Sequence, residues 1–282
     1  MRIGSSLSGV DLTTQHNLLR AFNQLNQSSV RLATMNRINS GSDDPAGLIA
    51  AENLRAELTA IEEASANAAR ARGVVRTADA AMSEVSSLLN TIRGNVVSAA
   101  SSGYSDAELQ AMQIETDAAL DAIDRIGDIT SFGGNHLLDG SGTTFVFSPD
   151  AGDTVSLALP NINTSALGGA AGRLSDLAGG GSASLTSGNL AEAMSILDSA
   201  GGQVLEARVR AGAFEKYTID SSQRVLDSMA ENISSAFSQI QDTDVAAETS
   251  RSMRSEILVQ AATSAVMQAG RSRSLLGGLF GF

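Results

Sequence analysis

The sequence predicts a mainly α protein: a rod of long antiparallel coiled-coil helices with a small β-hairpin tip and both termini helical at one end. Over most of the chain, apolar residues repeat at alternating intervals of three and four, which is the spacing of a coiled-coil seam. This period changes to two only in the middle of the chain. Aromatic residues are only 4% of the 282 residues, and tryptophan is absent. Such a composition suits long, closely packed helices better than a thick globular core.

The N-terminal part is expected to hold one helix, over about residues 15–35, after an irregular polar stretch at 1–15. Its apolar stripe consists of Leu18, Phe22, Leu25 and Leu32. The segment 37–45 combines turn-forming residues with a proline and should break the helix. A lone helix of about 25 residues with one apolar stripe is marginal in water, so this stripe needs a partner.

A second helix is predicted from Pro45 to about residue 101, with Asp44 as its N-cap and the proline at its first position. At 1.5 Å per residue this helix would be roughly 80 Å long. Its seam is predicted at Met82, Val85, Leu89, Ile92 and Val96. Ser105 and Glu108 have the spacing of a capping box and predict a third helix, over about 106–126.

The middle of the chain, around 131–187, is expected to form the tip of the rod. Alternating residues at 143–148 and 154–159 predict two short strands joined by a hairpin turn at 149–153. The stretch 160–187 is rich in glycine, serine, alanine and asparagine, so we expect a loop or a weakly ordered excursion here, and no second domain.

Helical sequence resumes after a second capping pair, Asn189 and Glu192, and continues to about residue 241. The seam of this part is predicted at Leu226, Met229, Ile233 and Ile240. The segment 242–244 should interrupt it and cap a last helix, which fades at Gly270 before an apolar, flexible tail at 277–282. The apolar positions of the last helix are Val245, Met253, Ile257, Leu258, Ala261 and Met267. The expected domains are paired terminal helices at 1–43 and 243–282 and a helical rod at 44–242.

Composition excludes several classes of function. The formal net charge is −12 and no basic face is visible, which argues against nucleic-acid binding. No apolar run reaches the ~20 residues that span a membrane, and the N-terminus lacks the pattern of a cleavable signal peptide. The absence of cysteine fits a cytosolic protein, and it equally fits one that travels unfolded without forming wrong disulfides.

No catalytic, cofactor or metal site is predicted. The only two histidines, His16 and His136, have no second ligand type at useful spacing. The carboxylates of Asp43 and Asp44 lie at a helix start, where capping explains them. The glycine-rich stretches lack the Lys-Ser/Thr pair that completes a phosphate-binding loop. The sequence therefore indicates a protein that is not an enzyme.

Two segments resemble motifs of the bacterial flagellins. Residues 37–47, Arg-Ile-Asn-Ser-Gly-Ser-Asp-Asp-Pro-Ala-Gly, are similar to the N-terminal motif of that family, and residues 240–249, Ile-Gln-Asp-Thr-Asp-Val-Ala-Ala-Glu-Thr, to its C-terminal motif. A third match lies within 123–140. The break between helices is assigned to five residues of the first motif: Arg37, Asn39, Asp43, Asp44 and Pro45.

The resemblance implies a short flagellin, without the additional outer domains, that self-polymerises into the flagellar filament for motility. The terminal helices would form the inner core of the filament, where their apolar stripes pack between copies. Besides other copies of itself, the implied partners are the flagellar export apparatus with its chaperone, and the filament cap and junction proteins. The implied location is extracellular, after export of the unfolded chain through the flagellar type III system without a cleavable signal peptide. No cofactor, nucleic acid or membrane insertion is implied.

Two other functions stay open. The hook–filament junction protein, a hook-associated relative, shares the terminal helices and part of the break motif. The start at residues 1–3 and the unusual end at 271–282 favour it. A cytoplasmic helical-hairpin protein used in signalling would explain the heptads, but neither the terminal motifs nor the predicted strands.

Overall fold

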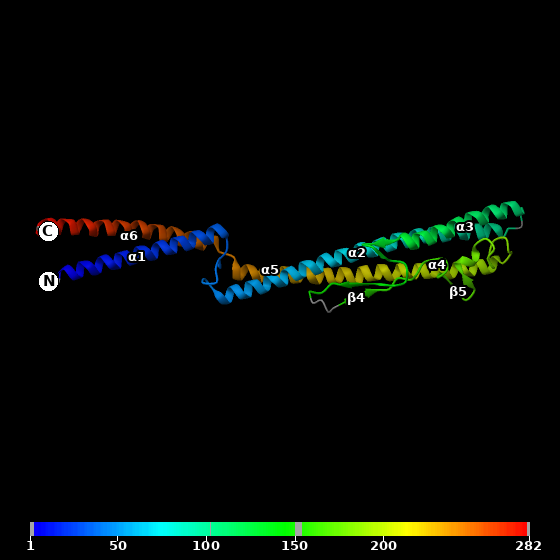
Figure 1. Ribbon diagram of the computed structural model, residues 1–282, viewed down its shortest axis with the longest axis horizontal. Helices are drawn as coiled ribbons and strands as arrows, with labels where there is room; N and C mark the ends of the chain where they lie inside the picture. The colour runs from blue at the N-terminus through cyan, green and yellow to red at the C-terminus, as the bar shows by residue number, and fades with distance from the viewer. Residues whose placement is uncertain (1–2, 102, 150–153, 281–282) are drawn as a thin grey trace. The chain divides into compact units, whose positions relative to one another are not determined.

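The computed structural model describes residues 3–101, 103–149 and 154–280, apart from the side chains of 3–11 and 272–280. Most of the described chain is helical, and the expected mainly α class is confirmed (Figure 1). The long helices are α1 (Ile3–Thr34), α2 (Pro45–Ala99), α3 (Asp106–Ile129), α4 (Leu190–Ala213), α5 (Asp220–Gln241) and α6 (Val245–Phe280). A π-helical segment, η2 (Phe214–Ile219), joins α4 to α5.

The strands are short and pair only with their neighbours in sequence. They form three antiparallel pairs: β1 (Ser131–Phe132) with β2 (Asn135–His136), β3 (Thr143–Val146) with β4 (Thr154–Leu157), and β5 (Gly168–Gly169) with β6 (Gly172–Arg173). A 3-10 helix, η1 (Leu174–Leu177), follows the last pair.

The chain divides into two compact units. The terminal unit comprises Met1–Leu58 and Glu231–Phe282, and the rod unit comprises Thr59–Ala230. Both divisions fall inside a helix, α2 in one case and α5 in the other.

In the rod unit, α2 runs antiparallel to α4 and α5. The order of their polar contacts shows this direction: Ser65 pairs with Gln223 at 2.7 Å, Arg72 with Asp220 at 2.8 Å, and Asp79 with Arg208 at 2.9 Å. Between them lies the apolar seam of α2, where Met82, Val85, Leu89, Ile92 and Val96 are all buried. Of the seam expected later in the chain, Leu226 is buried, whereas Met229, Ile233 and Ile240 are only partly buried.

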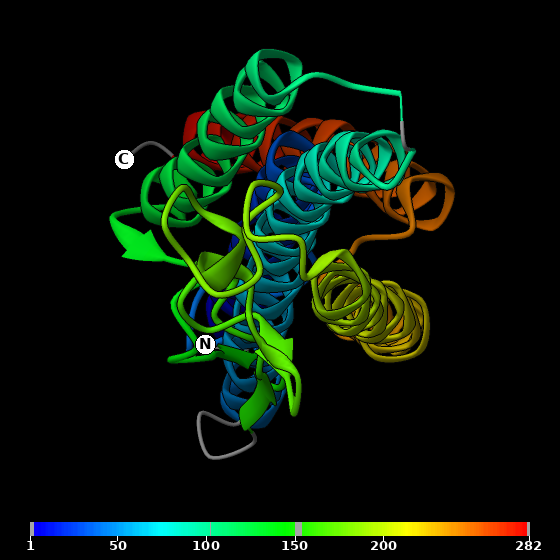
Figure 2. The same cartoon turned by 90° about the vertical axis from the view of Figure 1, so that its right-hand side faces the viewer.

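The stretch 160–187 packs against α3 and forms part of the rod core. Leu167, Leu174 and Leu177 are at most 1% exposed. The buried Gln113 of α3 donates to the Leu177 carbonyl at 2.9 Å and accepts from the Leu185 amide at 2.7 Å. Figure 2 shows this segment, in yellow-green, beside α3. The expected loop is confirmed, since turns and coil make up most of this stretch, but the alternative of a weakly ordered excursion was wrong. Leucines of the loop are buried in the rod core, and Gln113 of α3 supplies hydrogen-bond partners for its backbone.

The β3–β4 hairpin confirms the two predicted strands, with Thr143 opposite Leu157 and Val146 opposite Thr154. Phe145 and Phe147 stack with ring centroids 5.8 Å apart, and Phe214 of η2 lies 5.9 Å from Phe145. The aromatic contact holds this hairpin beside the end of α4, so its place differs from the expected tip. Most of the predicted turn, 150–153, lies outside the described residues.

Three local predictions about helix ends need correction. Helix α1 begins at Ile3, where an irregular stretch was expected, and α6 continues to Phe280, past the expected end at Gly270 and through most of the expected tail. The two helices pack against each other, and tertiary pairing of this kind overrides weak local propensity. Asn189 makes no capping bond, and its side-chain amide donates to the Ser182 carbonyl at 3.0 Å. By contrast, the Ser105–Glu108 capping box of α3 is present.

Candidate assembly site at the paired helix breaks

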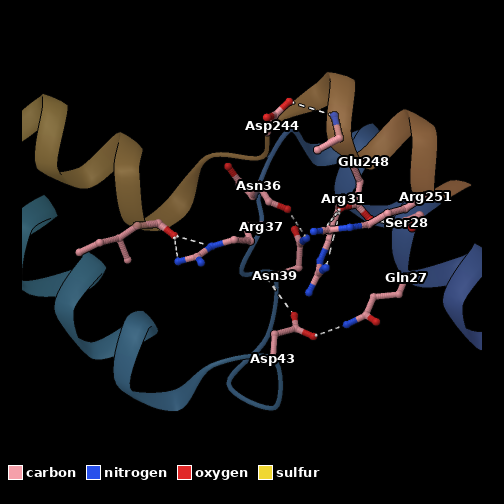
Figure 3. Close-up of polar contacts among 12 residues, drawn as sticks. Gln27, Ser28, Arg31, Asn36, Arg37, Asn39, Asp43, Asp244, Glu248 and Arg251 are labelled. Atoms are coloured by element: carbon pink, nitrogen blue, oxygen red, sulfur yellow. Dashed lines mark hydrogen bonds and ion pairs between the residues drawn. The ribbon is translucent and has the colours of Figure 1, made fainter.

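The two helix breaks of the terminal unit are joined by backbone hydrogen bonds. Helix α1 ends at Thr34, and the next residue, Met35, has a φ of +59°, the left-handed conformation in which a chain often leaves a helix. The Met35 carbonyl accepts from the Thr243 amide at 2.9 Å, and the Arg37 amide donates to the Gln241 carbonyl at 2.7 Å. A residue pair between these bonds, Asn36 and Asp242, forms an isolated antiparallel bridge. The break after α1 and the break before α6 therefore form one structure (Figure 3).

Side chains reinforce this connection at the C-terminal end of α5. The Arg37 guanidinium donates to the Ile240 carbonyl from Nε at 3.1 Å and from Nη2 at 2.7 Å. This carbonyl is one that the end of the helix leaves without a partner inside the helix. Gln241 donates in turn to the carbonyl of Ile38, a residue only 2% exposed. The arginine of the predicted break motif thus caps a helix far away in sequence.

Asp43 closes the loop that precedes α2. Its Oδ2 accepts the backbone N–H groups of Asn39 at 3.1 Å and Ser40 at 3.0 Å, and these bonds lower the pKa of the Asp43 carboxyl below its ordinary value of 3.8. The Gln27 amide of α1 donates to Oδ1 at 3.3 Å. The Asn39 side chain donates to the Asn36 carbonyl at 2.8 Å. The loop therefore holds α1 as well as α2.

The helices that follow the two breaks are capped by aspartates. Asp44 accepts from the Gly47 amide at 2.9 Å at the start of α2, with Pro45 as the first helical residue. Asp244 accepts from the amides of Ala246 and Ala247, both at 3.0 Å, at the start of α6. The capping that the sequence predicted for both aspartates is confirmed.

Gly47 has a steric role that the sequence did not reveal. A Cβ at this position would lie 2.4 Å from Asp44 Oδ2 and 2.7 Å from Ile38 Cδ1. The first atom belongs to the cap and the second to a buried side chain, so neither has free space to move into.

Glu248 of α6 is the buried charge of this region, at 3% exposure. Its carboxylate accepts from the Ser28 hydroxyl at 2.6 Å and from Arg251 at 2.9 Å, and Arg31 lies 4.0 Å away. Burial raises the pKa of Glu248, but the hydrogen bonds and the two arginines outweigh it, so the pKa lies below its ordinary value of 4.5. No role for Glu248, Ser28 or Arg31 follows from the sequence, because Ser28 and Glu248 lie 220 residues apart in the chain.

Helices α1 and α6 bury small or polar side chains against each other. Among the side chains that the structure describes on these two helices, Ala21, Ser28, Glu248 and Ser255 are buried. The larger apolar side chains remain in contact with solvent: Phe22 is 44% exposed, Met253 60% and Ile257 65%. Of the other predicted packing residues, Val245, Leu258, Ala261 and Met267 are exposed, and Leu18, Leu25 and Leu32 are partly buried. The structure thus places the predicted stripes on both helices, largely uncovered.

The two histidines and the possible metal ligands were also located in the structure. His16 and His136 are exposed, and among the described residues no three His, Asp or Glu side chains are grouped to hold a metal ion. No helix within the described ranges is both long enough and apolar enough to cross a membrane.

Comparison with known proteins places these helices in a family. The model of the bacterial flagellin N-terminal helical region matches residues 6–143, and that of the C-terminal helical region matches residues 194–277. The two matches contain both helix breaks and most of both terminal helices. The chain belongs to the bacterial flagellin family. Members of this family are structural proteins of the flagellar filament.

Individual relatives agree with this family assignment. The flagellin of Bacillus subtilis is 29% identical over 301 aligned positions, which cover 96% of this chain and 97% of that protein. The B-type flagellin of Pseudomonas aeruginosa is 39% identical over 159 positions, 56% of this chain. This chain spans only 33% of the length of the Pseudomonas protein.

The fold also has a counterpart among solved structures. A structure from Vibrio parahaemolyticus, described as a proposed flagellar hook-associated protein, superposes with a TM-score of 0.56 over 71% of this chain and 97% of that one. At 18% identity this likeness concerns the fold alone.

Proposed function

We propose that this chain self-polymerises into the flagellar filament, with α1 and α6 forming the inner core of the assembly. The observation that carries the proposal is the exposed apolar stripe on these two helices. Leu19 is 60% exposed, Ile257 65% and Met267 58%, although all three lie on helices that already pair with each other. Several large apolar side chains exposed on one pair of helices mark a surface that another protein covers.

Other copies of the same chain are the simplest cover for these stripes. Burying one such side chain contributes about 1.5–3 kcal/mol, and the stripes repeat along both helices. Contacts that repeat in this way, made in register by each added copy, would supply the free energy of assembly. The predicted packing residues Leu18, Phe22, Leu25, Leu32, Val245, Met253, Ile257, Leu258, Ala261 and Met267 are proposed to lie at these contacts.

Elongation of filament fragments by the purified chain tests the proposal directly. Sheared filaments from the source organism serve as seeds, and electron microscopy measures their length before and after addition of monomer. We expect growth at one end of each seed. Monomer that neither extends seeds nor sediments at any tested concentration would contradict self-polymerisation.

Folding of the terminal helices is proposed to accompany assembly. A helix pair that leaves most of its large apolar side chains in water is marginal alone, so α1 and α6 should be largely unfolded in the free monomer. Limited proteolysis of monomer and of filaments measures this. We expect cleavage within 1–40 and 245–282 of the monomer only. If these segments of the monomer resist cleavage as well as the rod unit does, the proposal is wrong.

We further propose that the chain is exported through the flagellar type III apparatus and functions outside the cell. A chaperone would bind it before export, and the cap and junction proteins would contact it afterwards. The alternative role, as the hook–filament junction protein, makes a different prediction for a deletion strain. Loss of a filament subunit should leave hooks with their junction in place. Loss of the junction protein should leave hooks without filaments and release exported flagellin into the medium.

A further inference from the structure

The terminal unit contains a basic cavity of about 340 Å³ between α1 and α6, and the proposed packing of apolar stripes gives no role to its arginines. Its lining includes Gln24 and Arg31 of α1 and Arg251, Arg254 and Leu258 of α6. Three of these residues are arginines, whereas Glu248 is the only carboxylate of the lining. The cavity therefore has an excess of two positive charges.

The contacts inside the cavity leave part of this charge without a counterpart. Glu248 accepts from Arg251 at 2.9 Å, but its nearest approach to Arg31 is 4.0 Å. The Arg31 Nε is buried and has no hydrogen-bond partner among the described residues. Arg254 likewise forms no ion pair within the part of the chain that the structure describes. A buried guanidinium N–H without an acceptor is costly, so the cavity is suited to a further anionic acceptor.

The distribution of charge along the chain indicates where such an acceptor comes from. Residues 1–34 and 245–282 contain seven arginines against three carboxylates, a net charge of +4. The rest of the chain contains twelve basic and 28 acidic residues, a net charge of −16. A second copy of the chain therefore brings many exposed carboxylates to a cavity that needs one.

Exposed apolar side chains at the rim of the cavity indicate that its occupant is part of another protein chain. Leu258 lines it and is 47% exposed, and Met253 on the same helix is 60% exposed. A neighbouring copy that covers these side chains would exclude water from the cavity. A guanidinium–carboxylate contact is stronger when it is shielded from water in this way.

We propose that the cavity formed by Arg31, Arg251 and Arg254 receives a carboxylate side chain from a neighbouring copy, which accepts hydrogen bonds from Arg31 and Arg254. This inference rests on the proposed polymerisation and adds the polar contact that fixes the register of one copy against the next. Apolar stripes alone fix register poorly, because they repeat along a helix. Two planar guanidinium groups can donate hydrogen bonds to one carboxylate in only a few orientations.

The density of wild-type filaments, determined by electron cryomicroscopy, tests this contact without any substitution. We expect a carboxylate of a different copy within hydrogen-bond distance of Arg31 Nε or of Arg254. A cavity that contains only solvent, an isolated inorganic anion or residues of its own chain would overturn the inference. Failure of the wild-type chain to form filaments would instead overturn the proposed function.

Substitution measures the energetic contribution of the contact. Arg254→Gln should raise the critical concentration for polymerisation by about tenfold, the size of one charge-assisted hydrogen bond. Arg224→Gln is the matched control, because Arg224 is an exposed arginine of α5 and its substitution changes the net charge by the same amount. Arg254→Lys, which keeps the charge, should lie between wild type and Arg254→Gln. Equal critical concentrations for Arg254→Gln and Arg224→Gln would count against a specific contact.

Discussion

The rod unit and the terminal unit contain apolar repeats of the same kind, but the repeats are buried in the rod unit and largely exposed in the terminal unit. In the rod, Ile92 and Val96 of α2 are fully buried by the same chain. In the terminal unit, Met253 and Ile257 of α6 remain 60% and 65% exposed although α6 is paired with α1. A coiled-coil spacing thus predicts that a stripe will be covered, but not which chain covers it.

The two units also differ in what fills the seam between their helices. The rod seam contains methionine, valine, leucine and isoleucine, and it is extended by α3 and the 160–187 stretch. The seam of α1 and α6 contains Ala21, Ser28, Ser255 and the hydrogen-bonded Glu248. Small and polar side chains hold this pair together and leave its larger apolar side chains for other contacts.

The largest expected effect is on the rod seam. Ile92→Ala should lower the free energy of unfolding by about 2–5 kcal/mol, because it removes buried methyl groups and leaves a cavity. Chemical denaturation of the purified chain, followed by circular dichroism, measures it. Ile257→Ala is the matched control and should change monomer stability by less than about 0.5 kcal/mol. A similar loss for both would mean that the α6 stripe is buried in the monomer.

In the filament, the substitution at Ile257 should have a large effect. Ile257→Ala is expected to weaken polymerisation by about 2 kcal/mol, or roughly 30-fold in critical concentration, because its side chain is buried only between copies. Sedimentation of polymer at a series of protein concentrations gives this value. An unchanged critical concentration would remove Ile257 from the proposed contacts.

A smaller effect is expected at the loop that joins the two breaks. Gly47→Ala should destabilise the terminal unit by about 1–3 kcal/mol, because the added methyl group displaces the Asp44 cap or the buried Ile38. Gly94→Ala is the control, since a Cβ there meets no atom within 4 Å and alanine favours the helix. Filament melting followed by light scattering should show a loss for Gly47→Ala and none for Gly94→Ala.

The smallest effect concerns pH and the buried carboxylate of the terminal unit. The pKa of Glu248 is lowered in the folded chain, so its contribution to stability is complete above the ordinary value of 4.5 and is lost as the pH falls through the folded value. Between pH 6 and pH 3, the critical concentration of wild-type chain should therefore rise more than that of Glu248→Gln. Glu256→Gln, an exposed position on the same helix, serves as control and should follow wild type. Parallel pH profiles for all three proteins would show that Glu248 is not linked to assembly.

Local signals allowed much of this molecule to be predicted from sequence. The Ser105–Glu108 capping box, the caps at Asp44 and Asp244 and the two strands of the hairpin all depend on residues that are neighbours in the chain. The predictions that were wrong involve distant partners. The ends of α1 and α6 depend on their mutual pairing, and the 160–187 stretch depends on Gln113 and the core beneath it.

The candidate site divides in the same way. The break motif, the apolar stripes and the family resemblance are visible in the residues themselves, because they depend on residue type and spacing. The bond from Arg37 to Ile240, the steric need for Gly47 and the burial of Glu248 beside Ser28 required the tertiary structure. Sequence alone determined that this chain has helical ends with apolar stripes that must be covered. Only the tertiary structure decided that α1 and α6 meet through small and polar side chains. Because these side chains fill the contact between the two helices, the larger apolar side chains remain exposed and available to other copies.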